Sequence, residues 1–145
     1  MPIKLKDINP VVFNHNVGIG VDNPSTKLEV NGEVKCTTLT QTSDYRLKQN
    51  VSVMNNGLDK IMQLKVHTFN WKNDNLESVG FLAHEIQGIV PGSVYGEKDE
   101  MYEDINAPKY QSVNSNPIVA VLVAAVKELN LKVEALEQKL SKYEK

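Results

Sequence analysis

The sequence has little of what several large protein classes require. Its 145 residues include a single cysteine, Cys36, which excludes an intrachain disulfide framework and a multi-cysteine zinc site within one chain. No apolar run reaches the roughly 18 residues that a membrane-spanning helix needs, and residues 1–10 lack the apolar core of a secretory signal. The 16 Lys and Arg residues do not exceed the 18 Asp and Glu residues, so neither nucleic acid nor a membrane surface is expected as a partner.

What is present changes character twice along the chain. Between residues 11 and 42, short apolar stretches at residues 17–20 and 28–30 alternate with turn residues such as Asn23-Pro24 and Asn31-Gly32. Each stretch can form only a short strand, which buries too little surface to offset the entropy lost on ordering it. Residues 1–43 are therefore predicted to form a β-stem that needs further copies of itself.

The middle of the chain has the pattern of a compact α+β body, predicted over residues 44–114. Residues 58–65 have helical spacing, and residues 66–71 alternate as a strand that places His67, Phe69 and Trp71 on one face. Phe69 and Trp71 are expected in the core. The other expected elements are an apolar strand at residues 79–83, a short helix ending before Pro91, and a hairpin formed by residues 101–105 and 109–113.

Residues 115–145 show the strongest periodicity and are predicted to form a coiled-coil helix, with Asn116 as its N-cap and Pro117 as its first residue. Apolar residues recur at alternating spacings of three and four, which is the heptad of a coiled coil. The heptad residues are Val119, Val126, Val133 and Leu140 at a, and Leu122, Leu129, Leu136 and Tyr143 at d.

The flanking charges favour parallel copies of this helix over packing on its own domain, which is the alternative. Lys132 and Lys139 at g each face a glutamate at e, Glu137 and Glu144, in a parallel neighbour. Such pairs contribute only tenths of a kcal/mol each, but they favour parallel alignment. Valine at a with leucine at d favours two strands when periodicity alone is considered.

Metal and cofactor motifs are incomplete. His84-Glu85 begins like the helix of a zinc protease, but Gly88 stands where the second histidine ligand belongs. Residues 17–20 lack the third glycine of a dinucleotide-binding turn, and the sequence contains no phosphate-binding loop. No cofactor and no metal are therefore expected.

The junction between stem and body contains Ser43 and, five residues later, Lys48. Serine and lysine can act as nucleophile and general base if burial or a neighbouring cation lowers the pKa of the lysine. Arg46 would share a face with Lys48 on a strand and could supply that positive charge. A spacing of five aligns side chains on neither a helix nor a strand, so Ser43 and Lys48 can meet only through a bend or across two chains.

The same junction resembles the opening of a known family. Ser43-Asp44, Arg46-Leu47-Lys48 and Asn50-Val51 are similar to the start of the C-terminal intramolecular chaperone domain of phage tail fibres, tailspikes, neck appendages and endosialidases, the peptidase S74 family. The likeness continues through a Phe-x-Trp strand at residues 66–71, residues 80–86, Pro91, Tyr110 and residues 124–129. Residues 17–32 also resemble the end of a phage fibre shaft, where three chains wind into a triple β-helix or β-prism.

The resemblance implies a homotrimer that templates the β-stem of its own chain and then cuts itself free, as a single-turnover, self-cleaving endopeptidase. Ser43 would be the catalytic serine, Lys48 its base and Ser43–Asp44 the cleaved bond, with Arg46, His84 and Glu85 as supporting candidates. It further implies assembly in the host cytoplasm, a stem that enters the virion tail or fibre, and a released chaperone domain that does not. The short shaft before Ser43 leads us to expect a truncated form of a longer fibre.

Several alternatives stay open at this point. A non-cleaving trimeric fibre tip could bind a receptor or clamp the stem, and a membrane-bound transcription factor carrying the same domain is a third, less favoured function. Attack of Ser43 on the preceding carbonyl passes through a five-membered ring and would open Thr42–Ser43, whereas attack on its own carbonyl needs a strained four-membered ring. A serine of another protomer or an activated water would account for cleavage after Ser43. Because of the spacing, we expect the dyad to be competent only in the assembled trimer.

Overall fold

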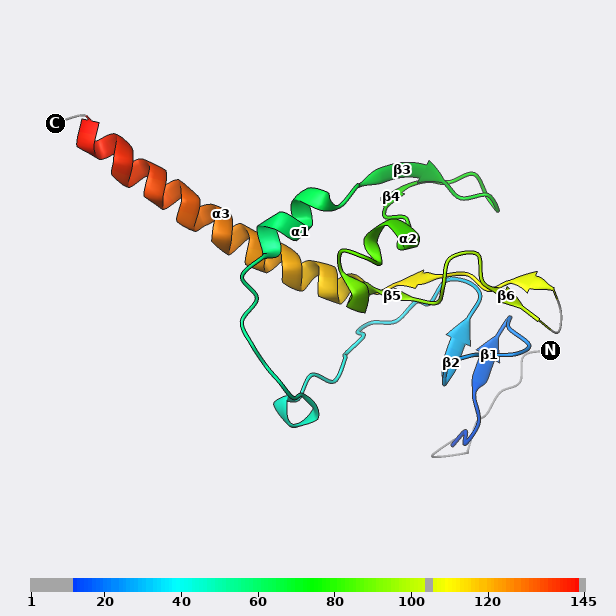
Figure 1. The fold of residues 1–145 in the computed structure, drawn as a ribbon. Coiled ribbons are helices and arrows are strands. Elements are labelled where there is room, and N and C mark those ends of the chain that lie inside the picture. Colours follow the sequence, from blue (N-terminus) through cyan, green and yellow to red (C-terminus); the bar gives the residue numbers. More distant parts are fainter. Residues whose placement is uncertain (1–11, 104–105, 144–145) are drawn as a thin grey trace. The chain divides into compact units, whose positions relative to one another are not determined.

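A computed structural model describes residues 12–103 and 106–143, and the chain divides into two units, residues 1–49 and residues 50–145 (Figure 1). Part of the predicted stem, residues 1–11, lies outside the described residues, as do Ile105 of the predicted hairpin and Glu144 of the predicted coiled coil. Each unit is described by itself. The combination of small sheets with a long C-terminal helix confirms the predicted mixture of helices and strands.

The first unit contains two strands of three residues each, β1 (Val17–Ile19) and β2 (Leu28–Val30). They pair in parallel, with Val17 opposite Leu28 and Ile19 opposite Val30. The loop between them is much shorter than the dozen or more residues of an ordinary parallel crossover, and Gly20 begins it with a φ of +69°. None of residues 12–49, the described part of this unit, is buried in a single chain.

The second unit has a mixed architecture with three two-stranded antiparallel sheets. Its elements in chain order are α1 (Gly57–Gln63), β3 (His67–Asn70), β4 (Glu77–Gly80), α2 (Ala83–Ile86), the 3₁₀ helix η2 (Pro91–Ser93), β5 (Val94–Tyr95), β6 (Met101–Tyr102), β7 (Ala107–Pro108), β8 (Ser112–Val113) and α3 (Ser115–Tyr143). Of these elements, α1 and η2 pack against α3.

Two predictions for this region are wrong in detail. Residues 101–102 pair with residues 107–108, whereas residues 112–113 pair with residues 94–95, so residues 101–105 and 109–113 do not form one hairpin. The reason is local, because Asn106 takes a positive φ of 47° and allows the chain to reverse early. The cap of α3 is also displaced: the helix begins at Ser115, and Asn114 Oδ1 accepts a hydrogen bond from Asn116 N at 3.0 Å.

The hairpin of β3 and β4 confirms the predicted alternation, since His67 and Phe69 are half-buried while Thr68 and Asn70 are exposed. Trp71 does not enter the core, contrary to expectation, and is 56% exposed. The strand ends one residue before it, and Trp71 begins the turn by accepting a backbone hydrogen bond from Asn75. Its ring packs edge-on against Phe69, with 5.3 Å between the ring centroids.

In the second unit, α1 packs closely on α3. Gly57 makes close approach possible, because a Cβ at this position would lie 2.5 Å from the backbone nitrogen of Ala125. Glu128 of α3 then caps α1, with its two carboxylate oxygens accepting hydrogen bonds from Gly57 N at 2.8 Å and Leu58 N at 3.0 Å. A side chain far along the sequence therefore satisfies the first amides of α1.

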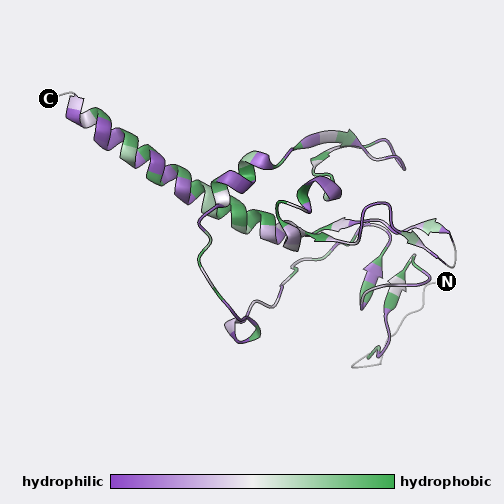
Figure 2. Cartoon of the chain, viewed as in Figure 1, coloured by the Kyte–Doolittle hydropathy of each residue, from purple (hydrophilic) through white to green (hydrophobic). Residues whose placement is uncertain are grey.

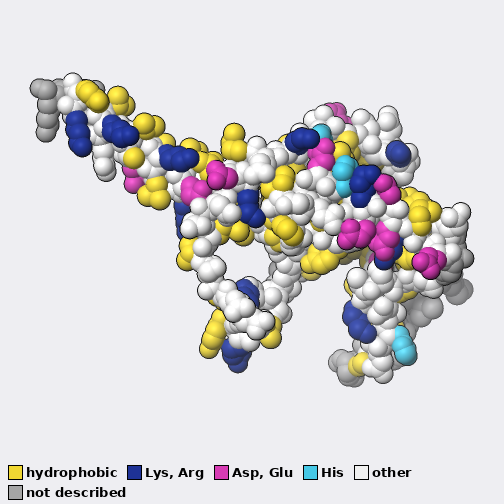
Figure 3. All heavy atoms as spheres, in the orientation of Figure 1, with side chains coloured by type: hydrophobic (Ala, Val, Ile, Leu, Met, Phe, Trp, Pro, Cys, Tyr) yellow, Lys and Arg dark blue, Asp and Glu magenta, His cyan; other side chains and the backbone are white. Residues whose placement is uncertain are grey.

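Two neighbouring faces of α3 have different surroundings. Ile118, Val121 and Ala125 are buried in the unit. The heptad residues, about 100° further round the helix, are all between 44% and 88% exposed. Figure 2 shows hydrophobic and hydrophilic residues alternating along α3, and Figure 3 shows hydrophobic side chains along the part that extends beyond α1. In the described part of the chain, the predicted heptad face is not the face that packs on the helix's own domain.

Candidate functional site

A tight bend at the end of the first unit brings the two predicted catalytic side chains together. Its centre is a 3₁₀ helix, η1 (Tyr45–Leu47), with extended backbone at Asp44 before it and at Lys48 after it. Backbone hydrogen bonds from Leu47 N to Asp44 O (3.1 Å) and from Lys48 N to Tyr45 O (3.0 Å) close the bend. The chain therefore reverses over a few residues, which neither a regular helix nor a strand would do.

Because of this bend, Lys48 Nζ donates a hydrogen bond to Ser43 Oγ at 2.7 Å. Of the two routes that the spacing left open, the bend within one chain is sufficient for contact. A second chain is therefore not needed to bring the two side chains into contact, and the expected dependence of cleavage on assembly requires a reason other than the spacing. A serine and a lysine within hydrogen-bond reach have the geometry of a nucleophile and its base. Both side chains are exposed to solvent in the single chain.

The Asp44 carboxylate holds Arg46 through three hydrogen bonds. Arg46 N and Nε each lie 2.9 Å from Asp44 Oδ1, and Arg46 Nη2 lies 2.8 Å from Asp44 Oδ2. The guanidinium lowers the pKa of Asp44 through its side-chain hydrogen bonds, and the carboxylate raises the pKa of Arg46 in return. The predicted strand shared by Arg46 and Lys48 is wrong, because Arg46 lies in η1 and its charge is paired with Asp44.

The other supporting candidates, His84 and Glu85, lie in α2 of the second unit. Glu85 Oε2 is 2.7 Å from His67 Nε2, and Glu85 Oε1 is 3.5 Å from Lys65 Nζ. The hydrogen bond to His67 is the main cause that lowers the pKa of Glu85. His84 is exposed. Sequence analysis did not associate His67 with Glu85, although the alternation of β3 already placed His67 on the inward face.

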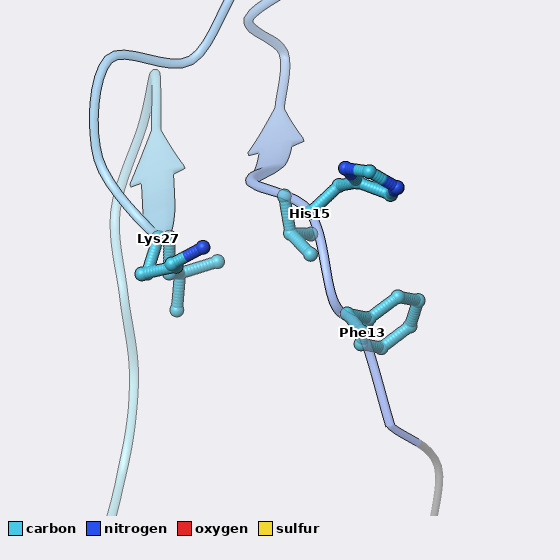
Figure 4. Close-up of a pocket in the computed structure, with 5 residues that line it drawn as sticks. Phe13, His15 and Lys27 are labelled. Carbon is cyan, nitrogen blue, oxygen red and sulfur yellow. The ribbon is translucent and has the colours of Figure 1, made fainter.

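A separate cavity of about 340 Å³ lies in the first unit, lined by Phe13, His15, Val17, Lys27 and Leu28. Phe13 and His15 precede β1, and Lys27 precedes β2 (Figure 4). No junction residue lines it. Within residues 12–103 and 106–143, no group of three or more His, Cys, Asp or Glu side chains is placed to hold a metal ion. Among the same residues, no helix has the length and apolar character needed to span a membrane.

Comparison with known proteins agrees with the resemblance seen in the sequence. The sequence model of the peptidase S74 family, described as "Chaperone of endosialidase", matches residues 43–95. The match begins at Ser43 and includes the whole bend. The description of this family supports a chaperone role for the chain. Residues 43–95 thus match the peptidase S74 family, in agreement with the resemblance found in the sequence.

Individual relatives come from phages and from a eukaryote. The chain is 33% identical over 103 residues to the "Long tail fiber protein Gp37" of Enterobacteria phage K3, an alignment with 68% of this chain and 8% of that protein. An uncharacterized protein of Dictyostelium discoideum is 32% identical over 145 residues, covering 90% of this chain and 13% of the relative. "Myelin gene regulatory factor-like A" of the same organism is 25% identical over 151 residues, covering 92% and 16%.

The chain spans only 8% to 16% of the length of these three curated relatives. The Dictyostelium matches extend over nearly the whole chain, so a shaft-like segment before the domain does not by itself distinguish a phage fibre from other carriers. Among solved structures, "Crystal structure of a novel intramolecular chaperon" aligns at a TM-score of 0.37 and 14% identity, covering 64% of this chain and 99% of that one.

Proposed function

We propose that this chain is a C-terminal intramolecular chaperone that trimerises, templates the β-stem before it, and then releases itself by autoproteolysis at Ser43–Asp44. One observation carries the proposal: the 2.7 Å hydrogen bond between Lys48 Nζ and Ser43 Oγ, at the residue where the family match begins. The family match supports the chaperone role. The nucleophile and base pair supports the cleavage role.

Self-association is supported by the exposed heptad face of α3. Covering a half-exposed valine or leucine contributes roughly 1 kcal/mol per side chain, and this face repeats along the whole helix. The g to e pairing of Lys132 with Glu137 matches a parallel copy of the same chain. Heptad rules alone would allow two strands. Three are proposed because the resembling fibre shafts wind three chains around one axis.

The template role follows from the contrast in burial between the two units. Residues 12–49 contain no buried residue in a single chain, so the strands among them need partners before they become stable. Bringing three such segments into register is a non-local step with a large entropic cost. A parallel coiled coil lowers that cost by raising the effective concentration of the segments and aligning their directions. Folding and association of the second unit thus promote folding of the first.

Cleavage requires a neutral Lys48 amine that can accept the proton of the Ser43 hydroxyl. The positive charge of Arg46 is paired with Asp44, which leaves burial as the means of lowering the pKa of the lysine. Since Ser43 and Lys48 are exposed in one chain, we propose that assembly buries them. This keeps the dyad inactive until the trimer has formed.

In the cleavage step, the bond between the carbonyl carbon of Ser43 and the nitrogen of Asp44 breaks. Attack by Ser43 on its own carbonyl would need a four-membered ring. We therefore propose attack by the serine of a neighbouring protomer or by water, with Lys48 taking the proton of the nucleophile and delivering it to the leaving amine. A serine route gives an ester that water then hydrolyses. Loss of the template leaves the stem kinetically trapped.

The phage relative supports a place for this chemistry in fibre assembly. The chaperone would act in the host cytoplasm, the stem would enter the virion tail or fibre, and the released domain would be left out. The substrate is the stem of the same chain. We take the Dictyostelium relatives to be different, longer proteins that contain the same domain.

The test combines intact mass and native mass of freshly purified protein. We expect a trimer and two products, residues 1–43 and residues 44–145, and no cleavage in Ser43→Ala or Lys48→Ala. Ser52→Ala and Lys72→Ala are matched controls, because both residues are exposed and lie outside the bend. If the native chain stays intact for days, a non-cleaving fibre-tip domain is the better description. Cleavage at Thr42–Ser43 would instead indicate an acyl shift.

A further inference from the structure

Asp44 and Arg46 form a hydrogen-bonded ion pair within the bend between Ser43 and Lys48. We infer that both are positioning residues, which set the distance between nucleophile and base without taking part in proton transfer. The inference rests on the proposed function and deepens it. It gives Asp44 a role beyond flanking the cleaved bond, and it replaces the electrostatic role first expected for Arg46.

The geometry of the Asp44–Arg46 pair supports this assignment. One carboxylate accepts three hydrogen bonds from Arg46, two from its side chain and one from its backbone amide. The backbone bond caps η1 at its N-terminus, and the two side-chain bonds match the planar fork of a guanidinium to the two carboxylate oxygens. The direction of the chain on leaving Asp44 is thereby linked to the position of Arg46.

Little else in the single chain holds the bend. η1 contains no buried residue, and its two apolar side chains, Tyr45 and Leu47, are 80% and 74% exposed. An ordinary exposed ion pair contributes little, but a bidentate arginine pair combined with a backbone cap belongs to the stronger exceptions. The other hydrogen bonds of the bend are the two backbone bonds of the turn and the bond between Lys48 and Ser43 itself. The Asp44–Arg46 pair is therefore the main constraint on the position of Lys48 relative to Ser43.

Position and charge are separable because lysine keeps the charge of Arg46 but lacks its fork. If Arg46 positions the bend, Arg46→Lys and Arg46→Ala slow cleavage by similar factors. If Arg46 instead acted on Lys48 through its charge, Arg46→Lys would stay close to the native rate, and Arg46→Ala would move the pH profile upward. The Arg46 variants test the positioning role more directly than Asp44 variants do, because Asp44 also supplies the leaving amine.

The experiment measures the first-order cleavage rate of the full-length trimer from pH 5 to pH 9. We expect both Arg46 variants and Asp44→Asn to cleave at least about tenfold more slowly, as small misplacements of reacting groups do, with the midpoint of the pH profile unchanged. Asp99→Asn is the matched control, because it removes the exposed Lys98–Asp99 pair outside the bend. A native rate in Arg46→Lys, or a shifted midpoint in Arg46→Ala, would overturn the inference.

A second measurement distinguishes this inference from the proposed function itself. In the Ser43→Ala background, where no cleavage is expected, amide hydrogen exchange at Leu47 and Lys48 reports the bend directly. Arg46→Lys should raise exchange at both amides severalfold, after correction for intrinsic rates, and Asp99→Asn should not. Unchanged exchange would refute the positioning role even if the native chain cleaves. If the native chain does not cleave, raised exchange still supports the role while the proposed function fails.

Discussion

The two units of the chain differ most in what a single copy can bury. Residues 12–49 contain no buried side chain, whereas the second unit buries Ile86, Val90, Ile118, Val121 and Ala125 around α1, α2 and α3. The second unit therefore has a core before it meets another chain, and the first does not. This order of events is what a folding template needs, because the template must be structured before the part that it helps.

The largest effect should come from separating the units. We expect residues 50–145 alone to keep their helical circular dichroism and to unfold cooperatively, because the packing of α1 on α3 lies entirely within them. Residues 1–49 alone should be disordered, since their short strands bury nothing in one copy. Residual β structure in the isolated first unit would contradict this difference between the units, because the stem would then not need a template.

A second large effect is expected from a charge on the heptad face of α3. Leu129→Asp should abolish the proposed trimer, because each chain would bury one unpaired carboxylate at a d position, at a cost of about 4 kcal/mol per chain, which corresponds to a roughly thousandfold weaker association for each chain. Leu131→Asp is the matched control, since Leu131 is 63% exposed against 51% for Leu129 but lies off the stripe. Sedimentation or native mass gives the oligomeric state.

If the two aspartate variants assemble equally well, the heptad face is not the contact between copies. The comparison also tests the order of events. In Leu129→Asp the second unit should keep its own fold, because the face against α1 is untouched, while cleavage at the junction should be lost. Cleavage in a confirmed monomer would mean that the bend is competent without assembly.

A smaller effect is expected at the contact of α1 with α3. Gly57→Ala should destabilise the second unit by about 2 kcal/mol, because its Cβ would collide with the backbone of α3 and overpack the contact. Gly88→Ala is the control, since no atom lies within 4 Å of a Cβ at that position, and its effect should stay within about 0.5 kcal/mol. Urea unfolding monitored by circular dichroism measures both. Equal stabilities would contradict the close packing at Gly57.

Much of the second unit could be predicted because its signals are local. The heptad of α3 and the alternation of β3 are repeats within a few residues, and both elements form as expected. The face of α3 that packs on α1 was not predicted, because Ile118, Val121 and Ala125 form a short pattern beside a much longer one. The capping of α1 by Glu128 depends on residues some seventy positions apart, which no local pattern reports.

At the candidate site, the sequence showed that a bend could bring Ser43 and Lys48 together, but it did not show the shape of that bend. The spacing of Ser43 and Lys48 required a bend, yet the element that forms it was expected to be a strand. The available signal was Asp44 two residues before Arg46, because an aspartate often accepts a hydrogen bond from the amide two residues on. Recognising that turn would also have shown that the charge of Arg46 is neutralised.

The smallest expected effect is on the acid dependence of stability. It is tested with two carboxylates, one in each unit, whose pKa values are lowered. His67 lowers the pKa of Glu85 from its ordinary value, chiefly through their hydrogen bond. Well above the ordinary pKa of a glutamate, Glu85 is ionised in both the folded and unfolded states, so its stabilising contribution is fully present. As the pH falls through its folded pKa, the unfolded state takes up the proton first, and the contribution is lost. Glu85→Gln should therefore reduce the loss of stability of the second unit between pH 5 and pH 3.

Asp44→Asn is the matched variant, because the pKa of Asp44 is also lowered but its partner Arg46 lies in the bend of the first unit. It should leave the acid dependence of the second unit unchanged, since Asp44 makes none of the contacts of that core. Urea midpoints at pH 7, 5, 4 and 3, followed through the helical signal of α3, measure both variants. Identical acid slopes for the native chain and Glu85→Gln would mean that the pair of His67 with Glu85 does not stabilise the fold. A changed slope in Asp44→Asn would mean that the bend and the core unfold together, and the two units would then have to be treated as one.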